Sequence, residues 1–380
     1  MKICIIARNI NDDYTGSFEF DQAIALKEAG HDIYVLSLDF RSVRKKRKIG
    51  IYLQEYKGIK IMRCSIPLGP LKGKVGDKMY SVFVKRAYRK LVEEAGTFDI
   101  IHTHFITISY IGITSLKHLM SVKTRIVVTE HSSTVNCDID SMPVDLAEKA
   151  AYVYKKADRV IAVSDTLAER IHRNFNVRCD VVYNVYDEDI FKYKEKSSFE
   201  NRPFRFVSVG NLNPNKRMDF LIKSFCKAFN KEEAELYIFG DGAEKQNLKS
   251  IIDSEGRAES IFLMGHVSRK EIADFYKNAD AFILLSEKET FGVSYVEAMA
   301  SGMPVISAHS GGPEGFVNSE CGIISGDSEE EVASDMRKMM LNINSYDRKQ
   351  ISDYAGLICG SKTVAEKLTR IYSDIIAQKN

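Results

Sequence analysis

Segments typical of buried strands alternate with helix-like segments from one end of the chain to the other. This alternation is typical of parallel α/β architecture, because a parallel strand is reached only through a crossover, usually a helix. In the first half, strands are expected at 2–7, 32–38, 98–102, 125–130 and 159–164. In the second half, they are expected at 204–209, 235–239, 260–264, 281–285 and 304–307. The pattern therefore predicts two successive α/β units.

Helix signals fall between these strands. Helices are expected at 18–29, 143–157, 218–229, 244–252 and 269–277, and capping boxes begin at Ser268 and Ser328. A polar, weakly periodic stretch at 184–203 is the expected linker. Because 380 residues exceed what one core usually supports, we expect domains at 1–186 and 187–362. Both are expected to be Rossmann-like and doubly wound, with their carboxyl strand ends facing a shared cleft.

Composition narrows the class of protein. Hydrophobic residues make up 44% and charged residues 28%, as in soluble globular proteins, and no apolar run approaches the ~20 residues that cross a bilayer. The first seven residues are too short for a signal peptide and indicate a strand. Seven cysteines without a Cys-x-x-Cys pair argue against a disulfide framework or zinc site. They favour a reducing cytoplasm.

Positive charge is concentrated between residues 41 and 96. This segment has 16 lysines and arginines against 4 acids, a local +12 in a chain of net charge +2. It contains the run Arg44-Lys45-Lys46-Arg47-Lys48, expected as a loop, and an amphipathic helix at 77–95 that carries Lys85 and Arg86. An anionic membrane surface is one interpretation, and a solvated helix whose apolar stripe docks on its own domain is another. Nucleic acid is disfavoured, since no recognition module or stacking platform is evident.

Two glutamates in the second half frame a predicted helix start. Glu289 and Glu297 lie on either side of it, Thr290 is the expected cap, and Gly302 ends the helix. Helix N-termini attract phosphate, whereas carboxylates accept hydrogen bonds from hydroxyls. The arrangement suits a nucleotide diphosphate sugar, although paired glutamates on a helix are often merely solvated. Glu297 lies in an otherwise apolar run, where an ionised group is costly without a partner.

Glycine turns and cations follow other predicted strands of this half. The turn at Gly210-Asn211 is followed by Lys216-Arg217, which would place positive charge at the carboxyl end of a strand, where anions bind. Both cations would also suit a solvated helix entry. The turn at Gly240 is interpreted mainly as a close backbone approach. The pair Gly311-Gly312 would let backbone N–H groups approach a ligand, but it is a weak signal alone.

In the first half, a loop that contains Gly16 joins the first strand to the first helix. His131 ends one predicted strand, and His102 and His104 bracket the end of another. Lone histidines are more often structural than catalytic, so these positions carry little weight by themselves.

Together these blocks resemble glycosyltransferase family 4, the retaining transferases of GT-B fold. The resemblance covers nearly the whole chain and is strongest from Val207 to Ile324. Its pieces include Val209-Gly210 with Lys216, Phe239-Gly240-Asp241-Gly242, Gly265-His266-Val267, Ala279-Asp280, the paired acids with Phe291-Gly292, Ser310–Glu314, 157–164 and 183–185. The resemblance implies that a C-terminal helix at about 363–380 returns to the first domain.

The resemblance also implies site roles. Glu289 would hold the donor sugar, Glu297 the ribose, and Lys216 the departing diphosphate, with His131 near the sugar. The implied catalytic residues are Glu289, His131 and Lys216. The implied donor-binding residues are Gly16, Gly210, Asn211, Lys216, Arg217, Gly240, Val267, Glu289, Thr290, Phe291, Gly292, Val293 and Glu297. The acceptor or membrane side would involve His104, Arg44, Lys45, Lys46, Arg47, Lys85 and Arg86. No metal or other cofactor is expected.

Three positions depart from the family pattern. Asn211 stands where arginine is common, so one of two phosphate cations is absent unless Arg217, which stands where glycine is common, reaches back. Gly16 stands alone where two adjacent glycines are common.

The leading hypothesis is a cytoplasmic transferase that moves a hexose or N-acetylhexosamine from a UDP-sugar to a glycan acceptor. That acceptor is expected to be lipid-linked, with the enzyme peripheral at the membrane. A nucleotide-sugar epimerase of the same fold and a non-catalytic nucleotide-sugar or glycan-binding subunit are the alternatives. The donor sugar, the linkage and the oligomeric state are not predicted.

Overall fold

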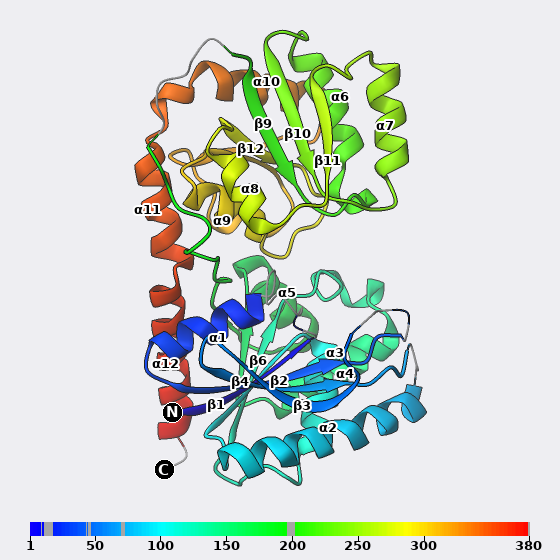
Figure 1. The fold of residues 1–380 in the computed structure, drawn as a ribbon, viewed down its shortest axis with the longest axis vertical. Coiled ribbons are helices and arrows are strands. Elements are labelled where there is room, and N and C mark those ends of the chain that lie inside the picture. Colours follow the sequence, from blue (N-terminus) through cyan, green and yellow to red (C-terminus); the bar gives the residue numbers. More distant parts are fainter. Residues whose placement is uncertain are drawn as a thin grey trace. The chain divides into compact units, whose positions relative to one another are not determined.

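The computed structural model describes residues 1–8, 10, 18–42, 44, 47–69, 73–195 and 202–378. The chain divides into two compact units (Figure 1). Unit 1 comprises Met1–Val185 with Ser361–Asn380, and unit 2 comprises Tyr186–Gly360. The predicted linker at 184–203 lies partly outside the described residues, and its Phe191 is buried in unit 2.

Unit 1 is built on an eight-stranded sheet with the order β3-β4-β2-β1-β5-β6-β7-β8. Its strands are β1 (Lys2–Arg8), β2 (Asp32–Asp39), β3 (Gly50–Tyr56), β4 (Ile59–Ser65), β5 (Ile100–His104), β6 (Arg125–Glu130), β7 (Arg159–Ala162) and β8 (Asp180–Val181). Its helices are α1 (Phe18–Glu28), α2 (Gly73–Ala95), α3 (Ile106–Leu116), α4 (Val144–Lys156), α5 (Asp165–Phe175) and α12 (Ser361–Ala377). All strand pairs are parallel except β3 with β4.

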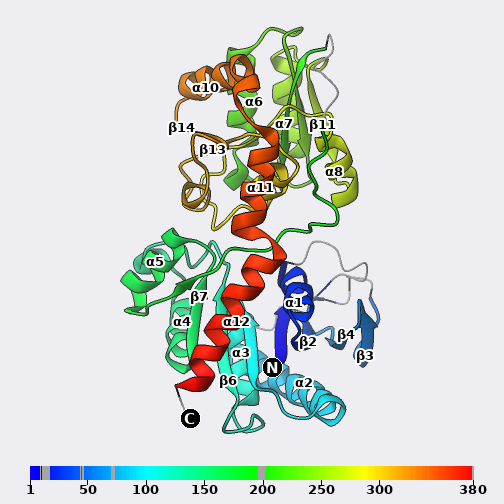
Figure 2. The same cartoon turned by 90° about the vertical axis from the view of Figure 1, so that its left-hand side faces the viewer.

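Helices cover both faces of this sheet. Alternate residues of β1 enter different cores: Ile3 and Ile5 pack with α1 and α12, whereas Cys4 and Ile6 pack with α2 and α3. The C-terminal helix α12 therefore belongs to the core of unit 1, beside α1 (Figure 2). The two histidines expected at the end of the third strand both lie within β5, because that strand runs two residues further than predicted.

Unit 2 is built on a six-stranded sheet, all parallel, with the order β11-β10-β9-β12-β13-β14. Its strands are β9 (Phe204–Val209), β10 (Ala234–Phe239), β11 (Ile261–Gly265), β12 (Ala281–Leu284), β13 (Val305–Ala308) and β14 (Gly322–Ser325). Its helices are α6 (Met218–Ala228), α7 (Lys245–Ser254), α8 (Arg269–Tyr276), α9 (Val293–Ala300), α10 (Glu329–Leu341) and α11 (Arg348–Cys359). Both predicted capping boxes are present, at α8 and α10.

Candidate active site

The centre of the unit 2 sheet is a topological switch point. The chain passes from β9 to β10 and β11 on one side and then crosses to β12, which also borders β9. Ligands of such sheets bind beyond the carboxyl ends of the strands at this point. The loops that follow β9 and β12 bring Lys216 and Glu289 together, with Nζ 2.6 Å from Oε2. Both side chains are largely shielded, with 18% and 17% exposed.

Asn215, which sequence reasoning missed, joins the same two loops. Its side-chain amide donates to the Lys288 carbonyl at 2.9 Å, and its side-chain oxygen accepts from the Lys288 N–H at 3.2 Å. Its backbone carbonyl accepts from the Glu287 N–H at 2.8 Å. These three bonds fix the loop that carries Lys216 against the loop that carries Glu289. No local sequence signal distinguishes this asparagine from an ordinary turn residue.

Helix α9 starts later than predicted. Its N-cap is Gly292, which has a left-handed φ of 91°, so the expectation that Thr290 caps the helix is wrong. A Cβ on Gly292 would lie 2.6 Å from the ring of Tyr295, which explains why the chain turns on a glycine. Thr290 is buried before the turn, and Val293 is the first helical residue. The first amides of α9 lack partners within the helix and form its positive end, next to Phe291.

Glu297 has the partner that its apolar surroundings require. Arg269, the first residue of α8, donates to Glu297 Oε1 from Nε at 3.1 Å and from Nη2 at 2.7 Å. The two side chains are 14% and 10% exposed, and the guanidinium also lies 5.5 Å from the Phe191 ring centre. Burial, with the Glu297 charge, raises the pKa of Tyr276 well above its usual value. Sequence reasoning missed Arg269, although the capping box at Ser268 had predicted this helix start.

The glycine turn after β10 packs against protein. Gly240 has a φ of 142°, and a Cβ there would lie 1.9 Å from the carbonyl oxygen of Gly210. The N–H of Gly210 donates to the Phe239 carbonyl at 3.0 Å, and the N–H of Gly240 donates to the Gly265 carbonyl at 2.8 Å. Gly240 therefore serves the close approach of the two loops, whereas a Cβ on Gly210 would only make an ordinary contact with the Lys216 side chain at 3.5 Å.

The paired glycines after β13 do not offer two free amides. The N–H of Gly311 donates to both carboxylate oxygens of Glu314 at 2.9 Å, so the expectation that it approaches a ligand is wrong. A Cβ on Gly312 would lie 2.7 Å from the backbone of Phe291. This loop thus supports the segment that leads into α9.

Three other candidate donor-binding residues follow strands of the unit 2 sheet. Asn211 is exposed, and Val267 is half-buried between β11 and α8. Arg217 adopts a left-handed φ of 47°, the conformation that glycine favours. Its guanidinium does not reach back: it lies 4.1 Å from the Phe220 ring centre and 3.5 Å from Asp327 Oδ1.

The predicted histidines form a buried cluster in unit 1. His104 Nδ1 lies 2.9 Å from His131 Nε2, and His102 contacts the hydroxyls of Tyr372 and Thr129 at 2.7 Å each. Burial lowers the pKa of His102 to about 3 and holds the pKa values of His104 and His131 well below the usual range. All three rings are therefore neutral near pH 7. One ring of the His104–His131 pair donates its N–H and the other accepts.

Glu130 precedes this cluster and is fully buried. Its Oε1 accepts from the backbone N–H groups of His131 at 2.9 Å and Ser132 at 2.7 Å. Burial raises the pKa of Glu130 to about 7, with these hydrogen bonds opposing the shift. The carboxyl group fixes the backbone that carries His131.

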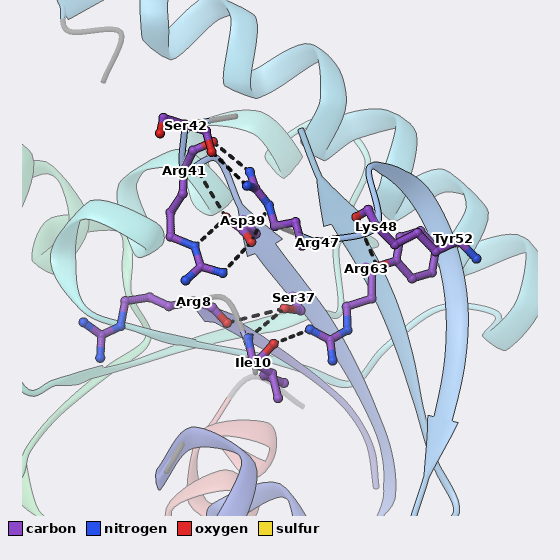
Figure 3. A network of polar contacts seen from close by, with 10 residues as sticks. All are labelled: Arg8, Ile10, Ser37, Asp39, Arg41, Ser42, Arg47, Lys48, Tyr52 and Arg63. Atoms are coloured by element: carbon purple, nitrogen blue, oxygen red, sulfur yellow. Dashed lines mark hydrogen bonds and ion pairs between the residues drawn. The ribbon is translucent and has the colours of Figure 1, made fainter. Parts of the chain in front are cut away.

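Arg47, expected on the acceptor or membrane side, is instead a structural residue. Its side chain is 5% exposed, and its Nε lies 2.8 Å from Asp39 Oδ2 (Figure 3). Its guanidinium also donates to the carbonyls of Ser42 at 3.0 Å and Arg41 at 2.7 Å. Burial would raise the pKa of Asp39, but hydrogen bonds from Arg41 and both arginine charges lower it overall.

The other acceptor-side candidates are separate from these clusters. Arg44 is exposed, and Lys85 and Arg86 lie on α2, half-buried and exposed respectively. Gly16, Lys45 and Lys46 lie outside the described residues. Across the described ranges, no group of three metal-ligating side chains gathers, and all seven cysteines are free. No helix among those ranges is long and apolar enough to span a bilayer.

This fold is that of the GT-B glycosyltransferases. Sucrose-phosphate synthase from Thermosynechococcus elongatus superposes with a TM-score of 0.80 at 16% identity, covering 99% of both chains. Anabaena HepE, solved with UDP and glucose, superposes with a TM-score of 0.73 at 16% identity, covering 98% of this chain and 100% of HepE.

Comparison with sequence families identifies the family within this fold. The model described as Glycosyltransferase Family 4 matches residues 20–190, and the model described as Glycosyl transferases group 1 matches residues 189–356. A relative from Bacillus anthracis, N-acetyl-alpha-D-glucosaminyl L-malate synthase, is 25% identical over 315 residues, which cover 79% of this chain and 77% of the relative. The chain belongs to glycosyltransferase family 4 and is a glycosyltransferase.

Proposed function

We propose that the protein transfers a hexose or N-acetylhexosamine from a UDP-sugar to a glycan acceptor with retention of configuration. The observation that carries this proposal is the Lys216–Glu289 contact of 2.6 Å at the switch point, beside the start of α9. A cation, a carboxylate and helix amides there match the diphosphate and hydroxyls of such a donor. The UDP in the HepE structure and the glucosaminyl product in the Bacillus relative's name support this donor class.

In this proposal each side chain has one task. Lys216 neutralises the diphosphate as it leaves, with help from the amides of Phe291, Gly292 and the first turn of α9. Glu289 accepts hydrogen bonds from sugar hydroxyls, and Glu297, held by Arg269, accepts them from the ribose. The acceptor hydroxyl attacks the anomeric carbon on the face that the phosphate leaves, and the leaving phosphate takes its proton. No metal ion or other cofactor has a role.

Neutral His131 is proposed to contact the donor sugar. A neutral imidazole can donate or accept a hydrogen bond without adding charge beside the anomeric carbon. Burial, by lowering its pKa, keeps the ring in this form.

The test compares Lys216→Ala and Glu297→Ala with Lys223→Ala, an exposed lysine on α6 that has no role in the proposed site. We expect UDP release from UDP-sugars, with and without acceptor, to fall about 10²–10³-fold in Lys216→Ala, as for other lost transition-state contacts. Glu297→Ala should weaken UDP binding, and Lys223→Ala should match the wild type. If the first two variants fold and keep full activity, the site is wrong. Epimer formation from a nucleotide sugar alone would instead indicate an epimerase.

We further propose that the acceptor is lipid-linked and that α2 contacts an anionic membrane. The helix docks on its domain through one face, where Val84 and Leu91 are fully buried. Its opposite face leaves Val75 and Val82 exposed at 69% and 63%. Arg86 is also exposed and continues that face along the helix. Apolar and basic side chains on one face suit the interface of an anionic bilayer.

Vesicle binding tests the membrane contact. Vesicles with phosphatidylglycerol should bind the wild type more tightly than phosphatidylcholine vesicles do, because each suitably placed cation contributes about 1 kcal/mol. Val82→Glu should weaken binding, while Val122→Glu, at a valine of unit 1 that is even more exposed, at 95% against 63%, should not. The proposal would be contradicted if the two variants bound vesicles equally well and the wild type bound both vesicle types equally well.

A further inference from the structure

Arg8 lies at the carboxyl end of β1, in the middle of the unit 1 sheet. β1 is flanked by β2 and β5, so Arg8 is at the edge where ligands of such sheets bind. Its side chain is 48% exposed and extends away from the cluster around Asp39 (Figure 3). Arg63, a nearby arginine at the same edge, is by contrast 4% exposed and donates to Gln54 at 3.0 Å.

The Arg8 side chain is held in place. Its guanidinium carbon lies 3.5 Å from the centre of the Phe105 ring. Its Nε lies 3.5 Å from Oε1 of Glu19, beyond the usual length of a charge-assisted hydrogen bond. No hydrogen bond joins the guanidinium to another of the described residues. The terminal nitrogens, which match carboxylate and phosphate oxygens, are therefore available.

The platform beneath Arg8 is part of the predicted catalytic region. Phe105 has a φ of 61°, an unfavourable conformation for an aromatic residue, and its N–H donates to the Thr129 carbonyl at 3.0 Å. Its ring centre lies 4.8 Å from that of His131, and Phe18 packs on His131 at 4.6 Å. Strained residues are retained where the surroundings fix them, often at functional sites. Phe105 thus places the Arg8 cation beside the histidine proposed to face the donor sugar.

The charge on Arg8 is not neutralised by these rings. After burial, the field of Arg8 is among the causes that lower the pKa values of His104 and His131, so both rings stay neutral. Glu19 offsets part of this charge, at 3.5 Å from Nε, but the outer edge of the half-exposed guanidinium faces no carboxylate among the described residues and attracts an anion.

We propose that Arg8 binds an anionic group of a substrate, a phosphate or a carboxylate, through the free edge of its guanidinium. This inference rests on the proposed function and specifies its substrate class. The anion has two possible sources: the donor diphosphate, or an acidic group on the acceptor near the attacking hydroxyl. In both cases two parallel N–H···O bonds fix the substrate beside His131.

Inorganic phosphate is the probe, titrated calorimetrically at constant ionic strength into the full chain with and without saturating UDP. We expect Arg8→Gln to raise the phosphate Kd at least about tenfold, and Arg8→Lys, which keeps the charge but loses the planar fork, to raise it severalfold. Arg159→Gln is the control, because Arg159 is also strand-terminal and 37% exposed, with a weak ion pair to Asp180 at 3.9 Å.

Each outcome decides the proposal. An unchanged phosphate Kd in Arg8→Gln and Arg8→Lys, or no phosphate binding by the wild type, overturns it. If UDP abolishes the Arg8-dependent binding, the anion is the donor diphosphate; if binding persists, it belongs to the acceptor. Failure of UDP to bind the wild type would refute the proposed donor, and the phosphate titration alone would still decide the role of Arg8.

Discussion

Replacing Arg269 with methionine should destabilise unit 2 and weaken binding of the donor nucleotide. Methionine keeps an aliphatic stem near the Phe191 ring but leaves the Glu297 carboxylate without its cation. Both hydrogen bonds, at 3.1 and 2.7 Å, end on one oxygen, and the pair is 14% and 10% exposed. Removing one partner of a buried pair costs about 3–5 kcal/mol, and the residual exposure favours the lower end. For a unit of this length, ~3 kcal/mol lowers the Tm by about 6–12 °C.

Calorimetry of the unit 2 transition measures this loss. Arg337→Met is the matched control, because Arg337 also lies over an aromatic ring, at 5.8 Å from that of Phe229, on the exposed side of α10. The double variant Arg269→Met/Glu297→Gln should regain much of the stability, since a neutral amide does not need the cation. A double variant less stable than Arg269→Met would refute the reasoning.

The single variant Arg269→Met also tests whether Arg269 positions Glu297 for the ribose or only stabilises the packing of unit 2. If Glu297 holds the ribose, Arg269→Met should weaken binding of UDP while leaving that of pyrophosphate unchanged. Equal weakening of both ligands would indicate general loosening of unit 2 instead.

Three further predictions concern stability. Gly240→Ala should destabilise unit 2 by more than about 2 kcal/mol in urea unfolding, because its Cβ would lie 1.9 Å from the Gly210 carbonyl oxygen. Gly256→Ala, where φ is also positive but the nearest atom is 4.0 Å away, should cost less. Glu130 has a folded pKa of about 7 and a lower unfolded one, so the folded state binds the extra proton. The contribution of Glu130 to the free energy of unfolding is therefore fully present at low pH and is lost as the pH rises from about 4.5 to 7. Glu130→Gln should remove this pH dependence from unit 1. Arg47→Met should cost about 2 kcal/mol in unit 1, because a buried carboxylate loses one of its two cations; a loss below 0.5 kcal/mol would contradict its structural role.

The strands that could be predicted are those that carry a run of mostly apolar residues, as is typical of parallel sheets. β6 and β9 have the predicted bounds. The antiparallel hairpin of β3 and β4 was missed, because the charge of residues 41–96 dominated the interpretation of that segment. A signal was present: Lys57 and Gly58 form its two-residue turn, both with positive φ, and glycine at the second position is typical.

Partners of site residues were harder to predict than the residues themselves. The apolar surroundings of Glu297 indicated that it needs a partner. The identity of that partner depends on the packing of α8 beside α9, which no local pattern contains. Arg47 was misassigned for the same reason, because its charge is visible in the sequence and the buried Asp39 that neutralises it is 8 residues away.

The ion pairs of Glu289 and Glu297 bear on how unit 2 would receive a donor. Lys216 contacts Glu289 without any ligand, so a diphosphate would meet an ammonium already engaged by a carboxylate. An ammonium has three N–H donors, so one bond to Glu289 leaves two for phosphate oxygens. The carboxylate then fixes the position of the cation and does not block it. Glu289→Gln, which weakens this bond, should therefore reduce transfer even with donors that lack the sugar hydroxyls that Glu289 is proposed to bind. If the loss instead disappears with such deoxy donors, Glu289 acts only through the sugar.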